Sequence, residues 1–143
     1  MKKLYVVGNK VSKSLSPTIF NYWFKKYNIK ASYGYLELTE KNFHNKIKDV
    51  LEKKDTLGLN VTIPFKNKII KHLRKIDTHA KKIGAVNCVT NKKTINGTNT
   101  DWTGYYKTLP NIKKTKNKKV IILGYGGASH AIHYVLKKRG FKD

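Results

Sequence analysis

The chain has 143 residues, a mass of 16.5 kDa and a formal net charge of +23. Its 39% of apolar residues and 10 glycines are typical of a globular protein, whereas one cysteine and three prolines exclude a disulfide scaffold, a cysteine-rich zinc module and a collagen-like chain. No apolar run approaches the roughly 18 residues of a membrane span, and the apolar stretch near the N-terminus is too short for a signal peptide. We therefore expect a cytoplasmic protein with no membrane partner, and the lone Cys88 fits a reducing compartment.

The charge could indicate a nucleic-acid partner, because clustered cations release counterions from a polyanion. However, 29 of the 31 basic residues are lysines, and they are spread along the whole chain. Proteins that read bases or hold phosphates usually rely on the bidentate guanidinium of arginine. We interpret the charge as a compositional bias on a solvated surface and expect no nucleic-acid partner.

The first predicted element is a buried strand at residues 4–8, followed by a polar loop at residues 9–15. Ser16 is then a suitable N-cap, and Pro17 a suitable first residue, for a helix. Apolar residues recur three and four positions apart along it, so they share one face. That face comprises Ile19, Phe20, Trp23, Phe24 and Tyr27.

Strands and helices continue to alternate along the next 60 residues. A strand at residues 33–38 precedes a helix from Thr39, and a strand at residues 57–62 precedes a third helix that buries Ile69, Ile70 and Leu73. This alternation predicts an α/β fold with a mostly parallel sheet flanked by helices. Residues 86–90 and 94–98 have the pattern of a hairpin, which we place at one edge of the sheet.

A lysine-rich segment divides the chain. Residues 110–118 contain almost no apolar side chains, which is typical of an interdomain linker between a domain at residues 1–109 and a second one at residues 119–143. The second part begins with a buried strand at residues 119–123 and continues through a glycine-rich turn into a helix. One strand and one helix cannot bury their own apolar faces, so we expect a truncated second domain and a chain that is the N-terminal piece of a longer protein.

The glycine-rich turn contains Gly124, Gly126 and Gly127 and lies between a predicted strand and a predicted helix. In such a turn the first glycine permits the tight bend and the second lets a pyrophosphate approach the helix N-terminus. Ser129 stands where the dinucleotide-binding fingerprint has its third glycine. The alternative interpretation is a strand–helix turn that binds nothing.

Several polar residues follow predicted strands, where ligands of α/β proteins bind. Asn60 and Thr62 share one face of their strand, and Lys66 follows within one helical turn. Asp101 is the only carboxylate between Asp77 and Asp143. It could pair with a lysine as an acid–base unit, because a carboxylate orients an ammonium group, or it could only cap a helix.

Other candidate residues carry weaker signals. Ser12, Ser14 and Ser16 could present hydroxyl groups to a carboxylate or belong to a solvated loop, and Asn87 could be an ordinary turn residue. The five histidines show no metal-ligand spacing with acidic residues or cysteine, so we expect no metal site. Cys88 lies in an apolar strand and is interpreted as a buried structural thiol.

Five segments in order resemble those of the shikimate dehydrogenase family. They are Ser14-Leu15-Ser16-Pro17, Asn60-Val61-Thr62-Ile63-Pro64-Phe65-Lys66, Gly84-Ala85-Val86-Asn87, Asn99-Thr100-Asp101 and Gly124-Tyr125-Gly126-Gly127-Ala128. The resemblance covers the whole chain but only about the first half of such an enzyme. It implies a shikimate-binding domain followed by the first strand and helix of a truncated Rossmann NADP-binding domain.

The resemblance also implies roles for individual residues in the NADP-dependent reduction of 3-dehydroshikimate to shikimate. Ser14 and Ser16 would bind the substrate carboxylate, and Thr62, Asn87 and Asp101 the ring hydroxyls, with Asn60 lining the same pocket. Lys66 would be the general acid, with Asp101 beside it. The cofactor NADP would be held by Gly124, Gly126, Gly127 and Ala128.

Two departures from the family pattern are Cys88, where threonine is usual, and Tyr125 within the glycine turn. The family's 2′-phosphate-binding segment would lie beyond Asp143, so we expect the chain alone to be inactive or nearly so. The resemblance allows a homodimer. Alternatives are an NAD-dependent quinate/shikimate dehydrogenase, a non-catalytic shikimate-binding module and a nucleic-acid-binding protein.

Overall fold

The computed structural model describes residues 1–109 and 119–141, so the predicted linker at residues 110–118 lies outside the described residues. The strands are β1 (Lys2–Gly8), β2 (Ala31–Glu37), β3 (Thr56–Val61), β4 (Lys75–Ile76), β5 (Cys88–Asn91) and β6 (Ile95–Thr98). The helices are α1 (Ser16–Lys26), α2 (Phe43–Glu52), the 3-10 helix η1 (Lys68–His72), α3 (Thr78–Ile83), α4 (Asp101–Thr108) and α5 (Gly127–Lys138). Within the described ranges, none of these helices is long and apolar enough to cross a lipid bilayer.

The six strands form one mixed sheet in the order β2-β1-β3-β5-β6-β4, which agrees with the predicted α/β class. β1 pairs in parallel with both β2 and β3, whereas β5 pairs antiparallel with β3 and β6. The predicted hairpin therefore exists, but its placement at the edge of the sheet is wrong. The two-residue strand β4 pairs with β6 and forms that edge, and two residues are too few to produce a recognisable alternation.

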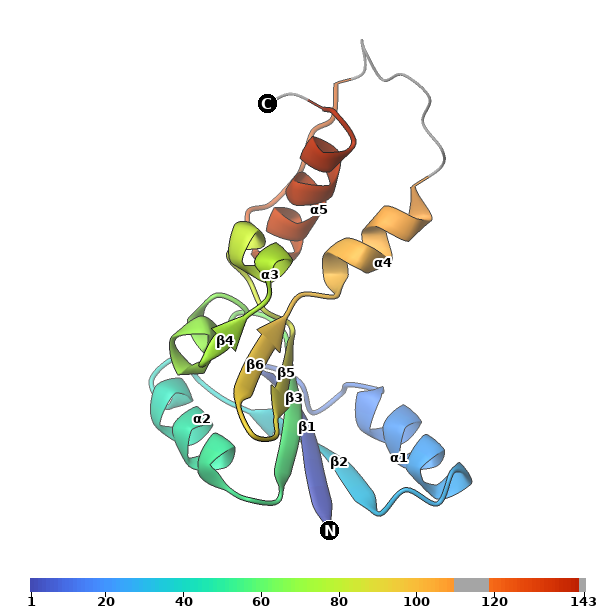
Figure 1. The fold of residues 1–143 in the computed structure, drawn as a ribbon, viewed down its shortest axis with the longest axis vertical. Helices are drawn as coiled ribbons and strands as arrows, with labels where there is room; N and C mark the ends of the chain where they lie inside the picture. Colours follow the sequence, from blue (N-terminus) through green and yellow to red (C-terminus); the bar gives the residue numbers. More distant parts are fainter. Residues whose placement is uncertain (110–118, 142–143) are drawn as a thin grey trace.

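Alternate residues of the central strands face two different helical layers. Val7 packs with α2 and η1 in the larger apolar cluster, whereas its neighbour Val6 packs with Tyr33 and the α1 side chain Phe20. Figure 1 shows α1 and α2 on opposite sides of the sheet. The period of two along a strand thus sets the three-layer arrangement.

Helix α1 begins differently from the prediction. Leu15 occupies the N-cap position, Ser16 is the first helical residue and Pro17 the second, and no side chain caps the start of this helix. The predicted apolar face is also only partly covered, since Trp23 and Tyr27 are 45% and 63% exposed. Ser16 is consequently not committed to capping.

The third predicted helix is a short 3-10 helix, η1, in which Ile69 is fully buried. The helix that follows, α3, was missed. Its start is capped by the Asp77 carboxylate, which accepts from the backbone N–H groups of His79 and Ala80, and its end is Gly84 in the left-handed region at φ 72°. These two capping residues are the sequence signals from which α3 could have been predicted.

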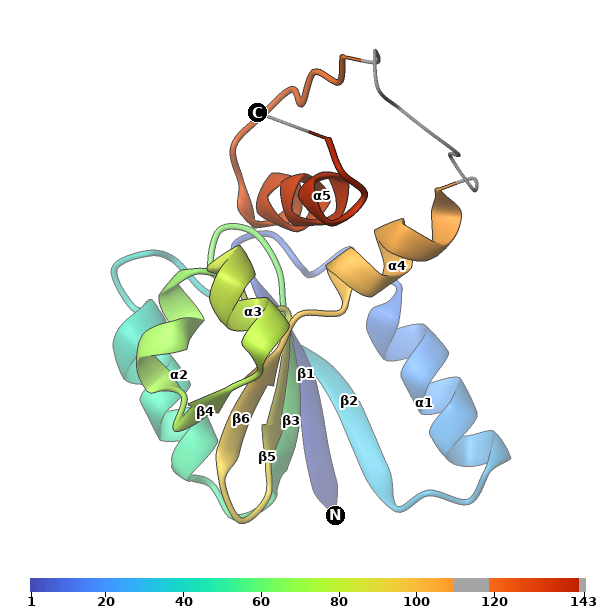
Figure 2. The same cartoon turned by 45° about the horizontal axis from the view of Figure 1, so that its top comes forward.

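The strand predicted at residues 119–123 is wrong, because this segment is irregular and pairs with no strand of the described residues. Ile121 and Leu123 are 83% and 93% exposed, so the apolar run that suggested burial has no sheet to join here. The following helix, α5, is present as predicted. It packs against α3 and α4 beyond the carboxyl ends of the strands (Figure 2).

Candidate active site

A cavity of about 580 Å³ opens at the carboxyl ends of β1 and β3, between the sheet and the loop that leads into α1. The seven residues singled out from the sequence as substrate-binding or catalytic candidates all line it. They are Ser14, Ser16, Asn60, Thr62, Lys66, Asn87 and Asp101. This position agrees with the general rule that open α/β sheets bind ligands beyond the carboxyl ends of their strands.

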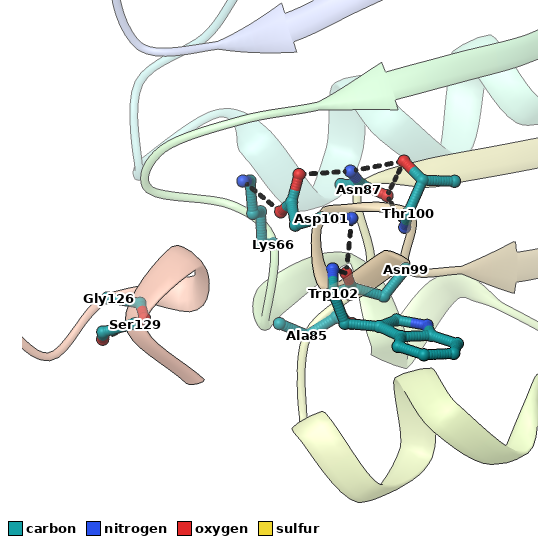
Figure 3. A network of polar contacts seen from close by, with 9 residues as sticks. All are labelled: Lys66, Ala85, Asn87, Asn99, Thr100, Asp101, Trp102, Gly126 and Ser129. Carbon is teal, nitrogen blue, oxygen red and sulfur yellow. Dashed lines mark hydrogen bonds and ion pairs between the residues drawn. The ribbon is translucent and has the colours of Figure 1, made fainter. Parts of the chain in front are cut away.

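The central contact of the cavity is an ion pair. Lys66 Nζ donates to Asp101 Oδ2 at 2.8 Å, and the side chains of Lys66 and Asp101 are 12% and 31% exposed. Figure 3 shows the ammonium group turned towards the carboxylate. A partly buried ammonium held in one orientation is suited to donate a proton to a bound ligand.

The alternative role of Asp101, as a helix cap, is taken by another residue. Asn99 Oδ1 accepts from the backbone N–H of Asp101 at 3.0 Å and of Trp102 at 3.4 Å, and its amide donates to the Ala85 carbonyl at 2.9 Å. Asn99 is only 3% exposed. Because Asn99 satisfies the start of α4, the Asp101 carboxylate is free to face Lys66 and the cavity.

Asn87 holds the other oxygen of Asp101. Its Nδ2 donates to Asp101 Oδ1 at 2.7 Å and to Thr100 Oγ1 at 2.9 Å, while its Oδ1 accepts from the Thr100 backbone N–H at 2.8 Å (Figure 3). The backbone donor fixes which end of the amide faces Asp101. Both Asn87 amide hydrogens are therefore engaged, and both Asp101 oxygens have a partner.

The other polar groups that line the cavity are less constrained. Ser14 Oγ accepts from the backbone N–H of Ser16 at 3.2 Å, which leaves the Ser14 hydroxyl hydrogen able to donate into the cavity. Asn60 Oδ1 accepts from the Tyr33 hydroxyl at 2.7 Å, so Asn60 presents its NH₂ group to a ligand. Burial raises the pKa of Tyr33 to about 12, so that hydroxyl remains a donor at neutral pH.

The glycine turn faces Lys66 from α5. Gly124 has φ 106°, which permits the bend, and added side-chain atoms at Gly124 or Gly126 would meet open space. Ala128 is exposed in the first turn of α5. The open backbone at this helix N-terminus fits a nucleotide phosphate, and Tyr125 beside it is 90% exposed and edge-on to His130.

A second cavity, of about 300 Å³, lies between the glycine turn and Lys66 and is lined by Ile63, Pro64, Gly126 and Gly127 among others. Lys66 lines both cavities. A further cavity of about 570 Å³ lies on the other side of the turn, between α3 and α5, where Lys81 and Lys82 are exposed. Cationic and open backbone groups therefore flank the turn.

The remaining candidates lie apart from the cavity. His44 Nδ1 and His72 Nε2 are 2.8 Å apart, and burial together with the neighbouring ring lowers the pKa of His72. His79 Nδ1 lies 2.7 Å from the Tyr134 hydroxyl and stacks on Trp102. These histidines make packing contacts, as expected, and Cys88 is half-buried rather than fully buried.

Three contributors to the site were missed from the sequence. Tyr33 orients Asn60, Thr100 orients Asn87, and Glu37 accepts from backbone groups of the loop that carries Ser14. The only sequence signal for Glu37 is a carboxylate at the end of a predicted strand. Tyr33 and Thr100 carry no such signal, because their partners are distant in sequence or are backbone atoms.

Comparison with known proteins gives a consistent result. A family profile described as "Shikimate dehydrogenase substrate binding domain" matches residues 6–89. Shikimate dehydrogenase of Thermotoga petrophila is 37% identical over 141 residues, covering 99% of this chain and 53% of that protein. Shikimate dehydrogenase (NADP(+)) of Pelagibacter ubique is 40% identical over 146 residues, covering 96% of this chain and 53% of that protein.

Solved structures are similar over the same part. The crystal structure of shikimate dehydrogenase from Thermotoga maritima has a TM-score of 0.85 at 35% identity, covering 99% of this chain and 53% of that one. The Thermus thermophilus enzyme in complex with shikimate has a TM-score of 0.81 at 27% identity, covering 98% and 54%. The chain spans about half the length of the curated relatives that it matches.

Proposed function

The chain belongs to the shikimate dehydrogenase family, and from this membership we propose that it is the substrate-binding part of an enzyme that reversibly reduces 3-dehydroshikimate to shikimate with NADPH. The reaction is a step on the route to chorismate and the aromatic amino acids. Because the chain spans about half the length of its relatives, we propose that it is a fragment that is inactive, or nearly so, by itself. The lone half-buried cysteine is compatible with the cytoplasmic location that we propose.

One observation carries this proposal. Lys66, paired with Asp101 at 2.8 Å, lies where the larger cavity meets the cavity beside the glycine turn. An enzyme that reduces a carbonyl needs a hydride donor facing the carbonyl carbon and a proton donor within reach of the carbonyl oxygen. Lys66 is the described residue that lines both of these spaces and carries a proton to give.

The two walls of the larger cavity suit two parts of the substrate. On one wall, the hydroxyls of Ser14 and Ser16 would donate to the substrate carboxylate, whose charge the nearby Lys10 and Lys13 favour. On the opposite wall, Asn60 and Thr62 would meet the ring. Asn60 would do so through its NH₂ group, because Tyr33 occupies its oxygen.

Asp101 and Asn87 would complete the binding of the ring hydroxyls. Asp101 has two acceptor oxygens, and each retains lone pairs beyond its present partner. Both hydrogens of the Asn87 amide are engaged, so a ring hydroxyl would reach Asn87 by donating to Oδ1 or by replacing Thr100 Oγ1 as acceptor. Asn87 would thus bind the substrate and orient Asp101 at once.

The proton transfer follows from the same geometry. Negative charge develops on the carbonyl oxygen of 3-dehydroshikimate during reduction, and the Lys66 ammonium stabilises it and donates a proton. In the reverse direction the neutral Lys66 amine removes the proton from the shikimate hydroxyl. Asp101 holds Nζ in place in both directions.

The open backbone of the glycine turn fits the phosphate groups of NADP, and Gly124, Gly126, Gly127 and Ala128 are the residues that would hold them. When bound, NADPH supplies the hydride. Several relatives are named as NADP(+) enzymes, whereas the Listeria monocytogenes structure was solved in complex with shikimate and NAD. We propose NADP, with NAD and quinate as the alternative pair.

We also propose that the protein forms a homodimer. β2 is an edge of the sheet, and the adjoining α1 leaves Tyr22, Trp23 and Tyr27 exposed. Two copies related by a twofold axis would cover these side chains and pair the two edges. Sedimentation equilibrium tests this: a dimer that Trp23→Lys dissociates supports it, and a monomer at high concentration contradicts it.

The enzymatic proposal is tested by expressing the complete polypeptide and following nicotinamide reduction with shikimate. We expect NADP to be reduced only when shikimate is present. Activity with NAD and quinate should be lower. A preference for NAD and quinate would favour the alternative pair. A folded complete protein that reduces neither cofactor would contradict the enzymatic proposal and favour a non-catalytic binding module.

A further inference from the structure

The loop at residues 9–15, called here the serine loop, joins β1 to α1 and places Ser14 in the larger cavity. It belongs to no strand or helix, so no regular hydrogen-bond ladder holds it. A pair of hydroxyl groups binds a carboxylate well only if both are held in the productive geometry before the ligand arrives. Asn9 holds the start of the loop, because its backbone N–H and its Nδ2 donate to the carbonyls of Ile63 and Leu38, both at 3.2 Å, so another group must fix the middle of the loop.

Glu37, the last residue of β2, makes the required contacts. Its Oε2 accepts from the backbone N–H of Val11 at 2.9 Å and of Ser12 at 3.0 Å. Two N–H groups in the middle of the serine loop thus converge on one carboxylate oxygen. The Ser12 backbone N–H first, then the Ser12 hydroxyl and the Val11 backbone N–H, lower the pKa of Glu37, and Lys10 contributes to the same effect.

A short series of hydrogen bonds connects these contacts to both serines. The Val11 carbonyl accepts from the backbone N–H of Ser14 at 2.9 Å, and Ser14 Oγ accepts from the backbone N–H of Ser16 at 3.2 Å. Val11 is itself buried, so it cannot move without disturbing its neighbours Val6 and Tyr33. Glu37, Val11, Ser14 and Ser16 therefore form one connected unit.

We propose that Glu37 is a positioning residue, which fixes the serine loop so that the hydroxyls of Ser14 and Ser16 are set to receive the substrate carboxylate. Glu37 does not line the cavity, so it acts through the loop and not by touching the ligand. The inference rests on the proposed function, because it assigns the two serines to the carboxylate of shikimate.

Two variants of Glu37 test these contacts. Glu37→Ala removes the acceptor, whereas Glu37→Gln keeps a side chain of the same length with one acceptor oxygen. Because both N–H groups converge on a single oxygen, that amide oxygen can replace it. Glu52→Ala is the matched control, since Glu52 is exposed at the end of α2 and outside the cavity.

The ligands are shikimate and its methyl ester, which keeps the ring but lacks the anionic carboxylate. Isothermal titration calorimetry of this chain should show that Glu37→Ala binds shikimate about tenfold more weakly, equivalent to roughly 1.4 kcal/mol, while affinity for the ester changes little. Glu37→Gln should stay within about twofold of the unmodified chain, and Glu52→Ala should be unchanged. Thermal unfolding checks that each variant is folded.

An equal loss of affinity for shikimate and its ester would show a general structural role and overturn the inference, as would a Glu37→Ala variant that binds like the unmodified chain. If the unmodified chain binds neither ligand, the proposed function fails for this cavity. Glu37 is then judged by amide hydrogen exchange of Val11, Ser12 and Ser14. If Glu37→Ala accelerates exchange of these amides about tenfold, Glu37 fixes the loop as proposed. If exchange is unchanged, the inference is overturned.

Discussion

Two asparagines that line the larger cavity, and Asn99 at the start of α4, have their amide groups oriented by neighbours. Tyr33 donates to Asn60, the Thr100 backbone donates to Asn87, and two backbone N–H groups at the start of α4 donate to Asn99. Each contact fixes which end of the amide is the oxygen. An amide that cannot flip presents one chemical group to the ligand, which is the basis of selective binding.

We expect Tyr33→Phe to remove the orientation of Asn60. The change leaves Asn60 Oδ1 without its 2.7 Å donor next to a residue that is 3% exposed. Loss of a partly buried hydrogen bond should lower the free energy of unfolding by about 1 kcal/mol, measured by urea denaturation. Tyr35→Phe is the matched control on the same strand, because Tyr35 is 55% exposed, and it should have almost no effect. Equal stability of the two variants would contradict the account.

Because Tyr33 ionises at high pH, we expect the free energy of unfolding to depend on pH in the alkaline range. Its folded-state pKa of about 12 lies above the ordinary value of 10.0 because the hydroxyl is buried. Below pH 10 the hydroxyl is protonated in both states, so its contribution to stability is complete. Between pH 10 and 12 the unfolded chain loses this proton first, so stability falls as the pH rises, and Tyr33→Phe should fall less steeply in denaturation at these pH values.

At the scale of elements, α5 touches the catalytic candidate directly. A Cβ at Gly127 would lie 3.0 Å from both Cβ and Cδ of Lys66, and Gly127 is buried. The glycine therefore lets the N-terminus of α5 approach the lysine stem closely. The turn that would hold the cofactor and the lysine that would donate the proton are packed as one unit.

Gly127→Ala should separate the two, because either Lys66 or α5 must move. A displacement of this kind at a reacting group lowers turnover, and we expect a loss of about tenfold or more in steady-state assays of the complete protein. Gly104→Ala in α4 is the control, since a Cβ there meets nothing within 4 Å. It should leave turnover unchanged and stabilise the helix by up to about 1 kcal/mol. Similar turnover of the two variants would show that the packing has no effect.

The sequence predicted those helices and strands in which apolar residues complete at least one full repeat of the helical or strand period. α2 is an example: its buried residues Phe43, Ile47 and Leu51 repeat every four positions. The ordered motifs likewise predicted which residues surround the larger cavity, since strand ends meet at one edge of a sheet.

Features that depend on a partner elsewhere in the chain could not be predicted. The run at residues 119–123 is apolar enough for a strand, but a strand also requires a neighbour to pair with. Glu37 could not be assigned either, because its partners are backbone N–H groups of Val11 and Ser12, some 25 residues earlier, and any residue type could supply them.

The whole molecule has a net charge of +23, and positive charge is also in excess around the larger cavity. Lys10, Lys13 and Lys66 line it together with a single carboxylate, that of Asp101. A surplus of positive charge around a concave site attracts an anionic ligand, and salt screens that attraction.

Shikimate affinity should therefore fall several-fold between about 0.01 M and 1 M ionic strength, where the Debye length shortens from roughly 30 Å to 3 Å. Calorimetric titration at several salt concentrations measures this, with the uncharged methyl ester as the control. The double variant Lys10→Gln, Lys13→Gln should reduce the salt dependence. An affinity for shikimate that does not change with salt would mean that the lysines are only a solvated surface.

We propose that Lys66, held by Asp101, transfers the proton in a reaction shared between the two cavities. It is tested by the steady-state kinetics of Lys66→Ala in the complete protein, with Lys71→Ala as the control, because Lys71 is exposed on η1 and lines neither cavity. We predict that kcat of Lys66→Ala falls by about 10²–10⁴ while KM for shikimate changes only a few-fold, and that Lys71→Ala is unaffected. A rise in KM with unchanged kcat would show that Lys66 only binds the substrate, and would contradict the account.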